Sequence, residues 1–192
     1  YLTAKNPSSG DKICNISRAS RKDVRNAVVA ARTGFNTWSG KTAYERGQVL
    51  YRLAEMLEGR KEQFIHEISV STTLSRQKAS KEVEKSIDRI IWYAGFADKW
   101  AQLIGTVNAV QEGYFNFSIP EPTGIVAIVL PDEPSFLSLV SRVCPVIVSG
   151  NSCVIIASET APLPALSFSE VIATSDVPGG VINILTGLKK EL

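Results

Sequence analysis

Residues 121–159 read EPTGIVAIVLPDEPSFLSLVSRVCPVIVSGNSCVIIASE, and this stretch decides the fold. It holds an apolar strand at Ile125–Leu130, a proline-rich turn, an apolar helix at Phe136–Val148, a Gly-Asn turn and a second apolar strand at Ser152–Ala157. Short, continuous apolar runs bounded by turn residues are typical of strands that are buried on both faces. The stretch therefore predicts a βαβ unit, the building block of nucleotide-binding α/β folds.

The same alternation of helix and strand continues after this unit. Pro162–Ala173 is predicted to be a second crossover helix, because proline fits the first turn of a helix, and Val181–Leu185 is predicted to be a third buried strand. Three parallel strands joined by right-handed crossovers make half of a doubly wound sheet. We therefore expect residues 123–192 to form a βαβαβ half-sheet of the Rossmann-like type within an α/β fold.

Residues 1–112 are predicted to form a strand at Lys12–Ile16 and then a helical layer. The expected helices carry apolar residues at helical spacing, and the first two begin with a capping box. The first helix runs from Ser20 to a C-terminal cap at Gly34, and the second begins at Thr42. The third covers Lys61–Val70, and the last covers residues 79–104. The charges on the last helix, including Glu82, Lys85 and Asp88, are interpreted as a solvated face.

Residues 113–122 are predicted to be an extended segment for oligomerisation. Gly113–Ile119 alternates aromatic and polar residues, which indicates an antiparallel or edge strand, and Pro120 and Pro122 then break it. An exposed aromatic strand needs covering, so we expect it to pair with a second copy of the chain or with the remainder of a longer parent chain.

Composition limits the class of protein. Hydrophobic residues make up 44% and charged residues 21%, which is ordinary for a globular protein, and a net charge of +2 gives no reason to expect a nucleic acid or an anionic membrane as partner. No leader pattern opens the chain, and no apolar run is long enough to span a membrane. Cys14, Cys144 and Cys153 are widely spaced and lack a zinc pattern, so we expect a cytoplasmic protein with reduced thiols and no metal site.

Short motifs spread along the chain resemble one family. They are Asn6-Pro7 with Gly10, Asp23-Val24 with Ala27-Val28, Glu45-Arg46, Tyr93-Ala94-Gly95 with Ala97-Asp98-Lys99, Glu121-Pro122-Thr123-Gly124, Gly150-Asn151, and Pro178-Gly179-Gly180-Val181. Together they make the whole chain, residues 1–192, similar to the N-terminal part of the aldehyde dehydrogenase superfamily. The resemblance implies a truncated NAD-binding-like domain, of open α/β type, with extended β-segments for subunit contacts. One parent protein that the resemblance suggests is a family-sixteen aldehyde dehydrogenase, in which the chain would be the degenerate extra unit.

The resemblance also implies where the chemistry would lie. Active members oxidise an aldehyde with a nucleophilic cysteine and a carboxylate base, both of which would follow Leu192. The asparagine that stabilises the oxyanion would fall in the turn Pro131–Pro134, where this chain has Glu133. An ionised carboxylate repels an oxyanion, and loss of such a donor typically costs about 3 kcal/mol. We therefore assign no catalytic residue in this chain.

Cofactor binding is expected to be impaired. The resemblance implies that Glu159 would hold the adenine ribose of NAD, but Ile156 stands where the family uses a lysine for the same ribose. Leu130 and Pro131 are candidates for the wall of an adenine slot. No GxGxxG turn follows the first strand. Alternatively, Leu130 and Pro131 only form part of the sheet core and anchor a loop. Glu159 is alternatively a solvated glutamate at the start of a helix, where the helix dipole favours a negative charge. We expect no cofactor for this chain, and NAD if there is one.

Three functions stay open at this point. The first is a non-catalytic aldehyde-dehydrogenase-like module, a pseudoenzyme, with a structural or protein–protein assembly role. The second is a fragment of an NAD(P)-dependent aldehyde dehydrogenase, whose catalytic cysteine and glutamate lie beyond residue 192. The third is a sheet that holds a nucleotide without catalysis. The chain alone is not expected to be an enzyme.

Overall fold

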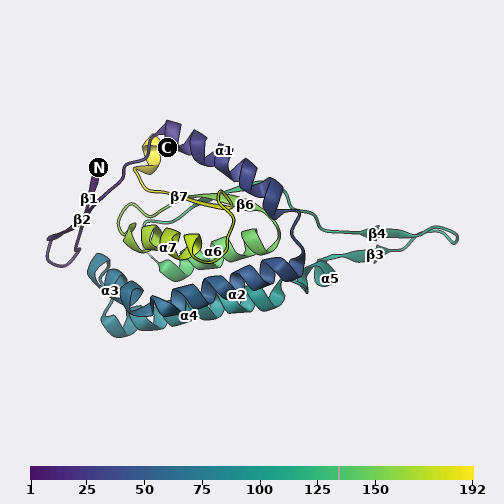
Figure 1. The fold of residues 1–192 in the computed structure, drawn as a ribbon, viewed down its shortest axis with the longest axis horizontal. Helices are drawn as coiled ribbons and strands as arrows, with labels where there is room; N and C mark the ends of the chain where they lie inside the picture. Colours follow the sequence, from purple (N-terminus) through teal and green to yellow (C-terminus); the bar gives the residue numbers. More distant parts are fainter. Residues whose placement is uncertain (134) are drawn as a thin grey trace.

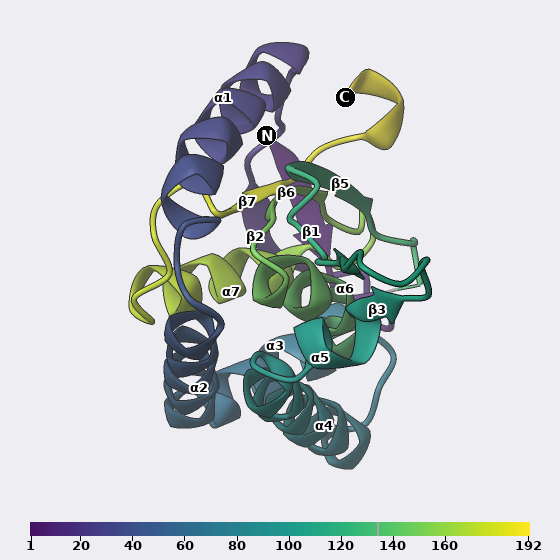
Figure 2. The same ribbon diagram turned by 90° about the vertical axis from the view of Figure 1, so that its right-hand side faces the viewer.

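The computed structural model describes residues 1–133 and 135–192 as an α/β fold built in layers. Its helices are α1 (Arg21–Trp38), α2 (Ala43–Gly59), α3 (Lys61–Ser71), α4 (Arg76–Phe96), α5 (Trp100–Ile104), α6 (Phe136–Val148), α7 (Leu163–Ala173) and the 3₁₀ turn η1 (Lys189–Glu191). Its strands are β1 (Leu2–Lys5), β2 (Lys12–Ile16), β3 (Thr106–Asn108), β4 (Asn116–Ser118), β5 (Ile125–Val129), β6 (Ser152–Ile156) and β7 (Ile182–Leu185). Figure 2 shows α1 on one face of the sheet β5–β7, α6 and α7 on the other face, and α2, α3 and α4 beyond them.

The parallel half-sheet forms as predicted. Strands β5, β6 and β7 lie side by side in that order and are parallel, with Ile128 beside Ile155 and Ile155 beside Ile184. The first four residues of β6 are buried, which explains why this central strand reads as an apolar run. The ends of all three predicted strands and both crossover helices lie within one residue of the expected positions.

The sheet packs differently on its two faces. On one face Ala27 and Ala31 of α1 contact Val154 of β6, and these small side chains let the helix lie close to the sheet. On the other face a single large core joins the sheet and α6–α7 to the helical layer. In this core the ring of Phe136 lies 4.8 Å from that of Phe64 and 5.4 Å from that of Phe168, measured between centroids.

Two expectations about the helices are wrong. Gly34 does not end the first helix, because α1 continues to Trp38 and Gly34 is buried inside it. The helix expected over residues 79–104 is two helices, since α4 ends at Phe96 and α5 begins at Trp100. Within the described parts of the chain, no helix has both the length and the apolarity needed to cross a bilayer.

The predicted edge strand is half of an antiparallel hairpin. Only Asn116–Ser118 of the expected segment is a strand, and it pairs with β3, which the sequence did not predict. Figure 1 shows this β3–β4 hairpin extending far from the body of the molecule. A cluster of amides and hydroxyls lines one face, where Asn108 donates hydrogen bonds to Asn116 at 2.7 Å and to Ser118 at 3.2 Å.

Side chains of the helical layer hold the C-terminal end of α6. The indole N–H of Trp38 donates to the carbonyl of Ile147 at 2.7 Å, and the Nε of Arg46 donates to the carbonyl of Val148 at 2.9 Å. Arg46 is only 7% exposed. The last carbonyls of a helix lack partners within the helix and carry partial negative charge, so a buried guanidinium is well suited to them.

The buried glycine in α1 gives a first prediction. A Cβ on Gly34 would lie 2.5 Å from the backbone of Gly180 and of Val181, so the helix and the loop before β7 would have to move apart. Overpacking of this kind costs about 1–3 kcal/mol. We expect Gly34→Ala to lower the free energy of unfolding, measured by urea denaturation, by at least this amount.

Gly59→Ala is the matched control for this prediction. Gly59 also lies in a helix, but its Cβ would meet nothing within 4 Å. Alanine is favoured over glycine in a helix by about 0.5–1 kcal/mol, so this variant should be as stable as the parent or more stable. Equal effects of the two substitutions would contradict the close approach of α1 and the loop.

Candidate functional site

The sequence-predicted site residues gather at one edge of the sheet. We call this the carboxyl edge: the C-terminal ends of β5, β6 and β7 with residues 130–133, 157–160 and 186–191. Leu130 is buried there, and its N–H donates to the carbonyl of Ile156 at 3.0 Å. Ile156 ends the central strand and lies between Val129 and Leu185. In open α/β sheets this edge is where ligands bind.

Glu159 is held by the chain itself. Its carboxylate accepts a hydrogen bond from the backbone N–H of Lys189 at 2.5 Å, at the start of η1. A carboxylate bonded in this way has one acceptor fewer for a ribose hydroxyl. The structure therefore gives Glu159 a role in fixing the segment that follows β7.

Asp132 and Lys189 close the same edge. The Lys189 ammonium lies 2.5 Å from the Asp132 carboxylate, and the carbonyl of Asp132 accepts the hydroxyl of Thr160 at 2.6 Å. These contacts tie the turn after β5 to the loop after β6 and to η1. Sequence reasoning missed Lys189. A lysine just after the third strand, at the edge that also carries Asp132, is the signal that would have found it.

Pro131, Asp132 and Glu133 are all exposed. The cavity behind this turn measures about 30 Å³ and is lined in part by Glu82, Leu130 and Glu133. Pro134, which completes the turn named in the sequence, lies outside the described residues.

The prediction that the charges of α4 form a solvated face is wrong for Glu82. Its carboxylate accepts the hydroxyl of Ser135 at 2.8 Å and the N–H of Leu137 at 3.2 Å, so it binds at the N-terminus of α6. A negative charge is favourable there, because the first N–H groups of a helix are unpaired. The position at which this helix could bind an external anion is thus occupied by the chain's own carboxylate.

The carboxyl edge does not fit the family's way of holding NAD. The cation expected at position 156 is a hydrocarbon, and Glu159 is already hydrogen-bonded to the backbone of Lys189. The residues present form contacts with one another instead. Among the described residues, no three His, Cys, Asp or Glu side chains come together in a way that suits a metal ion.

The three thiols lie apart from the carboxyl edge turns. Cys144 is buried in α6 and Cys153 in β6, while Cys14 is partly exposed in β2. Burial raises the pKa of Cys144 and raises that of Cys153 to about 12, because a thiolate loses its hydration in the core. A thiol with such a pKa carries almost no thiolate at neutral pH and is a poor nucleophile.

The parallel sheet with its crossover helices and its carboxyl edge defines an α/β domain of the nucleotide-binding type. A sequence profile described as "Aldehyde dehydrogenase family" matches residues 2–192. The chain belongs to this family.

Individual relatives show how much of a family member the chain represents. Mouse mitochondrial 10-formyltetrahydrofolate dehydrogenase is 31% identical over 191 residues, which cover 97% of this chain and 21% of the mouse protein. Retinal dehydrogenase 2 of Gallus gallus is 32% identical over 193 residues, which cover 95% of this chain and 35% of that protein. The crystal structure of PnpE in complex with nicotinamide adenine dinucleotide superposes with a TM-score of 0.93 at 30% identity, over 99% of this chain and 39% of the PnpE chain. The chain thus spans between about a fifth and two fifths of the length of these relatives.

Thiol alkylation tests the environment of the cysteines. At pH 8, iodoacetamide should label Cys14 in the native protein, whereas Cys144 and Cys153 should react only in denaturant, because their raised pKa values and burial withhold the thiolate. Peptide mass spectrometry then compares the labelling of the three cysteines in native protein with their labelling in protein denatured by urea. Native labelling of Cys144 or Cys153 as fast as that of Cys14 would contradict the buried assignment.

Proposed function

We propose that this chain is the coenzyme-side segment of an aldehyde-dehydrogenase-type polypeptide, an NAD(P)-dependent oxidoreductase that converts an aldehyde to a carboxylic acid. The observation that carries the proposal is the match of residues 2–192 to the family together with the superposition on the NAD-bound PnpE structure. The nucleophilic cysteine and the base would come from residues beyond 192, as the resemblance implies. Within that polypeptide this segment supplies the helical layer, the half-sheet and the hairpin.

A second candidate is a non-catalytic module with a structural or assembly role, and the carboxyl edge favours it. Glu133 puts a carboxylate where an amide donor is needed, Ile156 removes a cation, and Lys189 engages Glu159 and Asp132. Each of these changes weakens coenzyme binding or oxyanion stabilisation, and they occur together at one edge of the sheet. Cytoplasmic location and the family-sixteen assignment stay predictions.

Restoring the cation tests whether the missing lysine is what limits coenzyme binding. In the natural polypeptide that contains residues 1–192, we expect Ile156→Lys to tighten NAD binding at least tenfold, since charge-assisted hydrogen bonds are worth about 1.5–3 kcal/mol. Ile156→Met keeps the volume without the charge and should bind NAD as the parent does. Calorimetric titration of all three proteins gives the dissociation constants.

The parent protein's own result then assigns the function. Saturable NAD binding with NADH formation from a panel of aldehydes supports the oxidoreductase. A parent protein that neither binds NAD at millimolar concentration nor reduces it supports the non-catalytic module. If Ile156→Lys and Ile156→Met bind NAD equally, the loss of the lysine is not what limits coenzyme binding.

The β3–β4 hairpin supports a role in assembly within either candidate. It carries an exposed apolar set away from the body of the molecule (Figure 1), and its members are Val107, Tyr114, Phe115, Phe117 and Ile119. The rings of Phe115 and Phe117 contact each other with centroids 5.4 Å apart. A two-stranded ribbon with bare edges and an apolar face is only marginally stable alone. We propose that a second copy of the chain, or another part of the same polypeptide, covers it.

A substitution that introduces a charge on the hairpin tests whether another chain segment covers it. Phe117→Asp is expected to shift the natural polypeptide to a smaller assembly, because an aspartate would be buried without a partner in the interface. Light scattering after size-exclusion chromatography measures the mass. Val29→Asp, at an exposed position of α1 (59% exposed), is the matched control and should leave the mass unchanged. An unaltered mass for Phe117→Asp would argue that the hairpin is not an assembly surface.

A further inference from the structure

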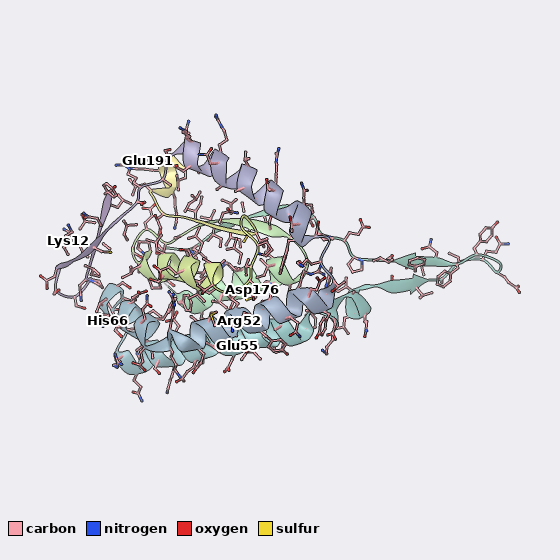
Figure 3. The ribbon with its side chains drawn as sticks, in the orientation of Figure 1. Lys12, Arg52, Glu55, His66, Asp176 and Glu191 are labelled. Carbon is pink, nitrogen blue, oxygen red and sulfur yellow. The ribbon has the colours of Figure 1, made fainter. Side chains whose placement is uncertain are left out.

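Helix α1 turns one side to the sheet and leaves the opposite side open to solvent. Ala27 and Ala31 pack against Val154 of β6, so the apolar side of the helix is buried. Figure 3 shows side chains of α1 that point away from the sheet at the boundary of the molecule, with Glu191 beside the start of the helix. No residue of this outer side belongs to the carboxyl edge or to the β3–β4 hairpin.

Four cations lie on the outer side of α1. We call them the α1 basic face: Arg21, Lys22, Arg25 and Arg32, all of which are exposed. At about 3.6 residues per turn they fall within about 100° of the helix circumference, and Arg21 and Arg32 lie roughly 16 Å apart along the axis. The cations therefore form a row along one side of a helix whose other side is fixed to the sheet.

The chain does not neutralise this row itself. Across residues 1–133 and 135–192, the ion pairs involve none of the four side chains. The one acidic residue of α1, Asp23, uses its carboxylate in the capping box, where it accepts the N–H of Ser20 at 2.8 Å. At the same end of the helix, the carboxylate of Glu191 is paired with Arg18. The charges of the α1 basic face are thus left to meet an external anion.

The side chains of this face suit carboxylate or phosphate groups. Three of the four cations are arginines, and a guanidinium donates two parallel hydrogen bonds to either group. Val29 lies between Arg25 and Arg32 in the sequence and on the same side of the helix, and it is 59% exposed. It gives the row an apolar contact point near its middle.

Three features favour an acidic protein segment over a nucleic acid or a membrane. The face has no aromatic side chain on which a base could stack. The apolar side of α1 is already buried against the sheet, so the helix has no apolar surface to place in a bilayer. The net charge of the chain is only +2, which gives little long-range attraction to DNA or to an anionic membrane, whereas a short acidic segment needs to match only this row.

We propose that the α1 basic face docks an acidic helix of a partner protein. Carboxylates at intervals of four and seven residues on a helix have the axial spacing of Arg21, Arg25 and Arg32, because both helices rise about 1.5 Å per residue. Each guanidinium binds one carboxylate, and Val29 contacts a small apolar side chain at the centre. Exposed ion pairs are individually weak and screened by salt, so the contact is transient and salt-sensitive. It requires neither NAD binding nor aldehyde oxidation.

The probe for this contact is a synthetic peptide of about 20 residues, long enough to form a helix in water. Its glutamates lie on one side at intervals of four and seven residues, on a background of alanine and glutamine. An isomer of the same composition has its glutamates spread around the helix. Fluorescence anisotropy measures binding to the natural polypeptide that contains residues 1–192. We expect saturable binding of the one-sided peptide, at least tenfold tighter than that of the isomer, at about 50 mM salt and its loss at about 300 mM.

Substitutions on α1 then test which residues bind the peptide. Arg25→Gln/Arg32→Gln should lose at least tenfold in affinity, and Arg25→Lys/Arg32→Lys should recover part of this loss, since an ammonium keeps the charge without the planar fork. The matched control is Lys5→Gln/Lys12→Gln, which removes two exposed charges that lie beside each other on the β1–β2 ribbon (Figure 3). It should bind the peptide as the parent does, and thermal melts check that all variants are folded.

Several results would overturn the proposal. They are equal loss in the arginine and lysine pairs, equal affinity for the two peptide isomers, and no saturable binding at millimolar peptide. A DNA duplex and phosphatidylserine vesicles are titrated in parallel. If either binds more tightly than the acidic peptide and shows the same loss in Arg25→Gln/Arg32→Gln, the face belongs to that polyanion and the acidic protein partner is wrong.

Discussion

Helix α6 is the element on which the rest of the structure depends, because both of its ends lie inside the protein and need partners. The carboxylate of Glu82 binds at its N-terminus, and Arg46 with Trp38 binds the carbonyls at its C-terminus. The signs agree with the helix dipole, negative at the start and positive at the end. All three partners come from α1, α2 and α4. The helical layer is thus more than a cover for the sheet: it supplies the hydrogen bonds without which α6 could not be buried.

Much of the fold could be predicted from the sequence, because the signals were local. The buried strands are short apolar runs, and capping boxes mark the starts of α1 and α2. What failed depended on contacts between distant segments. Gly34 looked like a helix end, but it is there because Gly180 and Val181 approach its backbone. Strand β3 has only three residues, too few for their alternation to stand out in the sequence, and it exists because it pairs with β4.

The sequence was enough to predict which residues lie in the candidate site, but not which contacts these residues make. The resemblance was enough to mark Glu133 and Ile156 as departures from the family. Nothing in the sequence showed that Glu159 would bond to the backbone of Lys189, or that Asp132 would pair with its side chain, because these residues are 30 and 57 positions away from it. Likewise the charges of α4 looked alike in the sequence. Only the packing of α6 distinguishes Glu82, which is bound at a helix end, from Lys81 and Lys85, which are exposed.

The capping of α6 also constrains the order in which the chain can fold. Trp38, Arg46 and Glu82 all precede α6 in the sequence, so during synthesis they leave the ribosome before the helix that they stabilise. Domains commonly fold as they emerge, N-terminal parts first. The α1–α4 segment can then act as a template on which α6 docks, before β6 and β7 exist to complete the sheet. A copy of the βαβ unit moved to another protein without these helices would carry a helix with unsatisfied ends, which gives a physical reason for the two parts to be inherited together.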